Sequence, residues 1–463
     1  MSAEQYIWNV SIIVQYDDSD PVVKGAYDEL EESILIQNRN DYINYFIFFY
    51  NRNGDSYIKK LRYGIYGAPK LSIEKNLGRI DFFNGTDLIA FLNDYVKPQE
   101  RGNHIRNLLI TWGHGAGYGF FAEENAGQQF EKKLNFSPLT GADVTEEIRF
   151  LKSQFSIEGI DPAFVTDTLN KRGFTTESTN VIAERVKVIS TVQLKTIIGQ
   201  SIGKVDVLLC LNCYMQTFES GYILRDVVDM VIAPQVMISF YGYNYKKLFE
   251  LLHIKPACEL EEIATNLTSY YLVKFEEEPL KSIVRDLRAK KKIMDIREVA
   301  FSAIQLKDYD QLFALLNEIA GYLLDHMSDR TLIDRCKKAR KKCLSVKGNF
   351  VIDFRHFFVE FCRYYAEEQI SVYEDDLQEF QARLFNFRKR NMVSILQPGI
   401  LLEADLSEQL LPSIGAQFFS IFFPFGYDRR QFDIRKLLFG YKKVIENSVW
   451  VEFLEKTNDR FQD

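Results

Sequence analysis

Apolar residues in the first half of the chain form short uninterrupted runs, and segments with helical spacing separate these runs. Five of the runs are rich in β-branched and aromatic residues and have the length of buried strands. They span residues 8–15, 45–50, 108–112, 205–209 and 230–238. Between them, residues 22–37 and the segments that begin at Thr86 and Thr191 carry apolar side chains every three or four positions. This alternation predicts an α/β fold with a mostly parallel sheet sandwiched by helices.

Beyond about residue 252, the apolar positions repeat with a helical period over longer stretches. The clearest stripes cover residues 263–275, 299–326 and 354–367. One late run, residues 417–424 (QFFSIFFP), has the composition of a buried strand. We therefore expect an α/β domain over residues 1–252 and a mainly helical C-terminal region over residues 253–463 with that one strand.

Residues 121–187 interrupt the pattern between two predicted strands. They are dominated by Glu, Lys, Thr, Ser and Asn, and no clear strand period remains in them. A connection of this length inside a compact domain is usually functional. We expect a long insert with a role in the activity or its control.

Composition and charge narrow the function classes. A formal net charge of -7 gives no electrostatic footprint for nucleic acid or an anionic membrane. The basic stretch at 285–297 is more typical of a solvated helix face. No apolar segment approaches the roughly 20 residues of a membrane span, and the first residues show no signal core. The six cysteines form no disulfide framework or zinc pattern, so we expect a reduced, cytoplasmic protein without a metal site.

Two reactive side chains directly follow predicted strands. His114 comes after the run at 108–112, inside Trp-Gly-His-Gly-Ala-Gly, and Cys213 comes after the run at 205–209. The carboxyl ends of parallel strands share one edge of the sheet, where a His and a Cys can form a thiolate–imidazolium pair. The amide of Gly115 could also stabilise an oxyanion. This pattern favours a cysteine peptidase.

The same residues allow less specific interpretations. His114 could be a hydrogen-bonded histidine in a glycine-rich turn, and both cysteines could be buried structural residues. Cys210 and Cys213 also form a C-x-x-C, which is typical of thiol–disulfide proteins. Strand alternation would place these two thiols on opposite faces, so the redox hypothesis is the least favoured.

The motifs resemble those of a known family. The pair His114-Gly115, the segment 211–215 (LNCYM), Glu219 and the triplet 224–226 (LRD) are similar to the His-Gly, D-A-C-L-M and E…LRD motifs of clostripain-type cysteine peptidases, in the caspase-like clan. The resemblance implies a caspase-like peptidase domain that acts on proteins or peptides. It implies that Cys213 is the nucleophile, that His114 is the general base and acid, and that the Gly115 and Cys213 amides hold the oxyanion.

The chain departs from this family where specificity is set. The family's acidic residues, which favour Arg or Lys at P1, correspond here to Leu211 and Tyr241, and Gln235 ends the neighbouring strand. Burying a cation in an S1 pocket without an anionic partner costs on the order of several kcal/mol. We therefore predict an apolar or aromatic P1 residue.

The resemblance also implies activation of a zymogen by cleavage between the His and Cys strands. Lys132, Lys133 and Arg172 are candidate cleavage positions, but an S1 pocket that rejects cations could not process them. An activating protease or a regulatory protein is therefore an expected partner. Part of the family depends on calcium, and Asp17, Asp18 and Asp20 could bind an ion, although a solvated loop is the commoner state of such residues. We expect no required cofactor.

An alternative function belongs to another class. Because the family's usual acids are absent, the chain could be a caspase-like pseudo-protease that acts as a binding or scaffold protein. This hypothesis predicts that a Cys213→Ala protein behaves like the wild type in every assay.

Overall fold

The computed structural model describes most of the chain outside one long interval and several shorter ones. The described residues are 7–17, 21–37, 42–64, 67–97, 105–115, 119–124, 186–235, 243–277, 301–328, 330–343, 345–347, 351–367, 374–396, 419–423 and 445–458.

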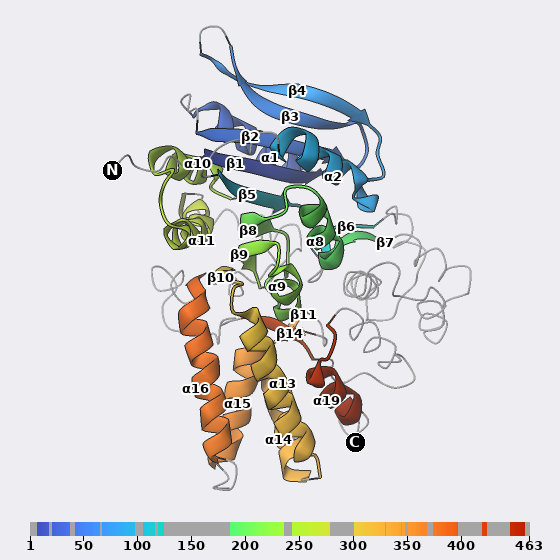
Figure 1. The fold of residues 1–463 in the computed structure, drawn as a ribbon, viewed down its shortest axis with the longest axis vertical. Coiled ribbons are helices and arrows are strands. Elements are labelled where there is room, and N and C mark those ends of the chain that lie inside the picture. Colours follow the sequence, from blue (N-terminus) through green and yellow to red (C-terminus); the bar gives the residue numbers. More distant parts are fainter. Residues whose placement is uncertain are drawn as a thin grey trace, which may run out of the picture.

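A nine-stranded sheet forms the centre of the molecule, in the order β13-β10-β9-β8-β5-β1-β2-β3-β4 (Figure 1). Its five middle strands are parallel. They are β1 (Ile7–Tyr16), β2 (Ile43–Asn51), β5 (Ile105–Trp112), β8 (Val205–Leu211) and β9 (Val228–Pro234). Antiparallel strands complete both edges, namely β3 (Ser56–Tyr63) and β4 (Pro69–Gly78) on one side, and β10 (Phe301–Gln305) and β13 (Met392–Leu396) on the other. The predicted fold class is confirmed.

Helices cover both faces of this sheet, which explains why its middle strands are almost continuously apolar. One face packs against the 3₁₀-helix η1 (Phe82–Asn84), α2 (Thr86–Phe91), the π-helical turn η2 (Leu92–Val96), α8 (Thr191–Gln200) and α9 (Phe218–Leu224). The other face packs against α1 (Pro21–Leu35), α10 (Tyr245–Ile254) and α11 (Leu260–Glu277). None of the helices within the described ranges combines the length and apolar character that a membrane crossing requires.

The C-terminal region forms a group of helices on the α9 side of the sheet (Figure 1). The described helices of this group are α13 (Tyr309–Asp325), α14 (Arg330–Lys342), α15 (Phe354–Glu367), α16 (Glu374–Asn391) and α19 (Val449–Asn458), whereas α11 packs on the other face. A small sheet joins β11 (Ser345–Lys347), β12 (Val351–Asp353) and β14 (Ser420–Phe422).

Strands are more numerous in this region than the sequence predicted. Five strands from β10 to β14 occur among its described residues, where one was expected, and β10 occupies the start of the expected helix at 299–326. These strands have three to five residues, too few to show a period of two in the sequence. β10 and β13 also extend the main sheet from beyond residue 252.

A two-stranded antiparallel ribbon lies beside α8 (Figure 1). It pairs β6 (Gly119–Glu124) with β7 (Val186–Ser190). These strands flank residues 125–185, so most of the predicted insert at 121–187, with Lys132, Lys133 and Arg172, lies outside the described residues.

Candidate active site

The loops that carry His114 and Cys213 lie against each other. They follow the neighbouring parallel strands β5 and β8, whose last residues Trp112 and Leu211 are paired in register. A Cβ atom added to Gly115 would lie 2.3 Å from the carbonyl oxygen of Cys213 and 2.5 Å from its nitrogen. Only glycine permits this approach, so the predicted meeting of the two motifs at one sheet edge has a direct structural basis.

Asn212 joins the two loops through its side chain. It is fully buried, and its Nδ2 donates to the carbonyl oxygen of His114 at 3.2 Å. Its Oδ1 accepts from Oγ1 of Thr111 at 2.6 Å. The residue between β8 and Cys213 therefore fixes the backbone of His114.

Gln15 supports the His114 loop from a third strand. Its Oε1 accepts from the backbone N–H of His114 at 3.0 Å, and its Nε2 donates to the carbonyl oxygen of Phe121 at 3.1 Å. Neither Gln15 nor Asn212 was among the predicted site residues. The available signal was a polar residue at the carboxyl end of an otherwise apolar strand, which is where site residues gather.

The two cysteines of the C-x-x-C face different environments. Cys213 is half-buried and packs against the cluster under α1 and α10, whereas Cys210 is buried in the cluster under α8 and α9. Burial raises the pKa of the Cys210 thiol to about 12, although a hydrogen bond with Thr111 acts in the opposite direction. Cys210 thus remains a thiol at neutral pH, and the expected placement on opposite faces is confirmed.

No helix begins directly after Cys213, although a strand that opens into a helix would place the helix dipole near the sulfur. α9 begins only at Phe218, and the side chain of Thr217 caps it by accepting from the amide of Ser220. Tyr214 has a φ of 64°, a left-handed conformation that interrupts a right-handed helix. The N-terminal dipole of that helix therefore supports no argument about the Cys213 thiol.

The residues predicted to line S1 have separate surroundings. Leu211 is 3 % exposed and belongs to the apolar cluster that Cys213 contacts. Gln235, at the end of β9, donates through Nε2 to Oδ2 of the buried Asp353 at 2.8 Å. Tyr241 lies outside the described residues.

The described residues offer no cluster of three or more His, Cys, Asp or Glu side chains that could hold a metal ion. Of the aspartates considered for calcium, Asp17 accepts from Asn53 and pairs with Arg52 at 3.9 Å. Asp18 and Asp20 lie outside the described residues.

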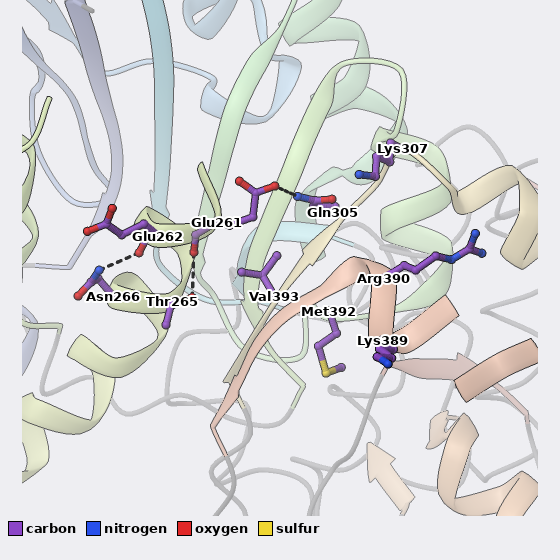
Figure 2. A pocket seen from close by; sticks show the side chains of 10 residues that line it. All are labelled: Glu261, Glu262, Thr265, Asn266, Gln305, Lys307, Lys389, Arg390, Met392 and Val393. Atoms are coloured by element: carbon purple, nitrogen blue, oxygen red, sulfur yellow. Dashed lines mark hydrogen bonds between the residues drawn. The ribbon is translucent and has the colours of Figure 1, made fainter. Parts of the chain in front are cut away.

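A cavity of about 580 Å³ opens between α11, β10 and the end of α16 (Figure 2). Glu261 and Gln305 line it on one side, and Lys307 and Arg390 line it on another. Gln305 pairs with Met230 near the start of β9, whereas the end of β9 lies beside the other end of β10. The cavity therefore lies near the amino ends of the parallel strands, whereas Cys213 lies at their carboxyl ends. A substrate bound in this cavity would not reach Cys213.

Comparisons with known proteins match this fold and the Cys213 segment. The sequence model of the clostripain family matches residues 182–406. An inactive zymogen of a C11 protease from Parabacteroides distasonis has a similar structure, with a TM-score of 0.57 and 12% identity over 97% of each chain. The structure of the secreted C11 cysteine protease "iotapain" from Bacteroides thetaiotaomicron is also similar, with a TM-score of 0.50 and 14% identity over 84% of this chain and 86% of that chain. No curated protein matches.

One expectation is overturned by these comparisons. The iotapain structure is described as that of a secreted protease, so the predicted cytoplasmic location was wrong. Free cysteines do not by themselves indicate a reducing compartment, because thiols such as those of Cys210 and Cys336 are buried away from solvent.

The comparisons agree with the resemblance to the clostripain family that the motifs indicated. In fold this chain is similar to C11 cysteine proteases, and over residues 182–406 its sequence matches the clostripain family.

Proposed function

We propose that the chain is an endopeptidase in which Cys213 and His114 form the catalytic dyad. The observation that carries the proposal is the packing of Gly115 on the Cys213 backbone, because it holds the two loops in one fixed arrangement. The side chain of Asn212 braces this arrangement through its hydrogen bond to His114.

The reaction follows from these roles. The Cys213 thiol gives its proton to the His114 imidazole, and the sulfur attacks the peptide carbonyl carbon. The amides of Gly115 and Cys213 stabilise the oxyanion of the tetrahedral intermediate. His114 then protonates the leaving amine, which departs and leaves an acyl-enzyme. Water, deprotonated by His114, releases the acid and restores the thiol.

The proposed S1 pocket accepts apolar or aromatic P1 residues. Leu211 brings an apolar side chain to the position where a carboxylate favours cations, and the side-chain amide of Gln235 is already bound to Asp353. A Lys or Arg side chain would lose its hydration there without gaining an ion pair from Leu211, Gln235 or Tyr241.

Regulation as a zymogen is part of the same proposal. The similar P. distasonis protein is described as an inactive zymogen, and β6 and β7 bring the two ends of residues 125–185 together in this chain. Cleavage in the 121–187 insert by another protease would activate the enzyme. Calcium would not be required, since Asp17 is already engaged by Arg52 and Asn53.

The test is a fluorogenic peptide library varied at P1, with and without calcium, before and after limited proteolysis. We expect cleavage after apolar or aromatic residues, and a loss of about 10³-fold or more in Cys213→Ala and His114→Ala. Cys210→Ala is the matched control, because that buried thiol takes no part in the reaction and should leave the specificity unchanged.

Each other outcome contradicts a defined part of the proposal. Cleavage only after Arg or Lys would refute the S1 assignment. Equal losses in Cys210→Ala and Cys213→Ala would indicate a thiol–disulfide protein. Wild-type and Cys213→Ala proteins that remain equally inactive after limited proteolysis would indicate a pseudo-protease.

A further inference from the structure

Gln15 connects two segments that are distant in the sequence. It ends the apolar part of β1, is 8 % exposed, and uses both polar atoms of its carboxamide. The oxygen accepts from the backbone of His114 at 3.0 Å, and the nitrogen donates to the backbone of Phe121 in β6 at 3.1 Å. A Cβ atom on Gly113 would lie 2.7 Å from the Cβ and Oε1 atoms of Gln15, so the loop is packed directly on this side chain.

The β6 end of this link is tightly packed. Phe121 is fully buried and has a φ of 60°, which a phenylalanine adopts only when its surroundings enforce it. Its ring packs edge-on against Phe82 with 5.2 Å between centroids. Phe120 also forms a β-bridge with Gly115. The His114–Gly115 loop is thus attached to β6 in two ways, through the side chain of Gln15 and through the backbone of Gly115.

Only a carboxamide satisfies both partners of Gln15. A glutamate could accept from the His114 amide but could not donate to the carbonyl of Phe121 when ionised. A leucine of similar size could do neither. The two hydrogen bonds can therefore be broken together or one at a time by substitution.

We propose that Gln15 is a positioning residue of the dyad that couples the place of His114 to the β6–β7 ribbon. The inference rests on the proposed function, since it assigns a role to Gln15 through His114. Because β6 and β7 flank the insert, a change in the ribbon reaches His114 through this side chain. A displacement of about 1 Å at a reacting group lowers a rate by roughly 100-fold.

The test compares Gln15→Leu and Gln15→Glu with Asn9→Leu. Asn9 is a fully buried amide in the same strand, hydrogen-bonded to Asn107 and Asn44 at 3.3 and 3.0 Å, but it lies at the opposite end from the site. Asn9→Leu therefore controls for the loss of stability alone. The measurements are the melting temperature, kcat and KM, the pH dependence of Cys213 alkylation, and hydrogen exchange at the His114 amide.

We expect Gln15→Leu to lower kcat by roughly 100-fold with little change in KM. The midpoint of Cys213 alkylation should move toward the ordinary thiol pKa of about 8.5, and the His114 amide should exchange faster. Gln15→Glu should protect that amide yet increase exchange in β6. Asn9→Leu should lower only the melting temperature.

The inference is overturned if Gln15→Leu keeps the wild-type alkylation profile and exchange rate, or if Asn9→Leu changes them equally. Failure of the dyad itself is separable. If His114→Ala leaves the alkylation profile of Cys213 unchanged, the proposed function fails, while hydrogen exchange still reports whether Gln15 holds the His114 amide.

Discussion

Gly115 shows how strongly one small residue determines the arrangement of the site. Its α-carbon occupies space between the His114 loop and the Cys213 backbone that no side chain can share. The neighbouring polar side chains of Asn212 and Gln15 then hydrogen-bond to the backbone of the loop. At the scale of single residues, the site is organised by contacts with the main chain.

We expect Gly115→Ala to reduce kcat/KM by about 100-fold or more. The added methyl group would approach the Cys213 backbone to 2.3 Å, and backbone cannot move aside as a flexible side chain can, so the loops must separate. Steady-state kinetics and a melting curve measure the effect.

The control is Gly25→Ala, whose new Cβ in α1 meets nothing within 4 Å. Alanine has the higher helix propensity, so this variant should gain about 0.5–1 kcal/mol of stability with unchanged kinetics. Wild-type kinetics in Gly115→Ala would refute the close packing of the two loops.

The carboxylate of Asp353 links α15 in the C-terminal region to β9 in the main sheet. Asp353 ends β12 and caps α15, because its Oδ1 accepts from the amide of His356 at 2.7 Å. Its Oδ2 accepts from Gln235 at the end of β9. The amide of Gln216, just after the Cys213 turn, also donates to the carbonyl of Pro234 in β9. The start of α15 is therefore connected to the edge of the sheet that carries the site.

Gln235→Leu should lower the free energy of unfolding by about 1–3 kcal/mol. The variant removes a donor from a carboxylate that remains fully buried, and a buried polar group that loses a partner is costly. Urea unfolding curves give the difference.

Gln305→Leu provides the matched comparison. Gln305 also donates to a carboxylate, that of Glu261, but this pair is exposed (Figure 2). The decrease in the free energy of unfolding of this variant should stay within about 0.5 kcal/mol. Equal losses in the two variants would show that burial of Asp353 contributes nothing.

The sequence predicts the elements that are long enough for burial to leave a clear apolar pattern. β1, β5 and β8 are buried on both faces and therefore appear as apolar runs, and α1 and α8 carry apolar stripes on one face. The hairpin of β3 and β4 was not predicted, because the outer strand is largely exposed and carries no apolar run. The pattern predicts a helix at β10 because three apolar residues within a five-residue segment fit either period.

The same distinction applies to the candidate site. His114 and Cys213 could be located because reactive residues that end strands are visible in the sequence. Gln15 and Asn212 also follow apolar runs, but their roles could not be predicted, because a side chain that hydrogen-bonds to a distant backbone leaves no periodic signal. Their partners depend on which strands are neighbours, and only the tertiary structure determines this.

At the scale of the whole molecule, one hydrophobic core crosses the boundary expected near residue 252. The cluster under α8 and α9 continues without interruption into α13, α15 and α19. Phe218, the first residue of α9, stacks on Tyr309 of α13 at 6.1 Å between ring centroids. A Cβ atom on Gly221 would meet the same Tyr309 ring at 2.3 Å. The C-terminal helices therefore support the segment that follows Cys213.

Buried histidines should make this fold less stable in acid. Burial lowers the pKa of His253, whose ring stacks on Tyr45. As the pH falls through the unfolded-state value of about 6.5, the unfolded chain takes up a proton before the folded one does, so stability falls with the pH. Urea unfolding at pH 7.5 and 5.5 measures the change.

His253→Phe should reduce that acid-induced loss, because it keeps a ring beside Tyr45 and removes the proton site. His356 remains in the variant, and burial also lowers its pKa, so part of the pH dependence should persist. An unchanged pH dependence in His253→Phe would show that His253 titrates alike in both states.

The placement of β10 and β13 has a consequence for how the protein is made. Both strands come late in the chain, yet they close the side of the sheet that begins at β9. During synthesis, β9 leaves the ribosome with an open edge that stays unpaired until residue 305 has emerged. The outer edge of β10 then stays unpaired until residue 396 has emerged. Open edges are templates for association with other chains. A fragment that stops at residue 252 would keep the bare edge of β9, whereas a fragment that continues through residue 396 would cover it with β10 and β13.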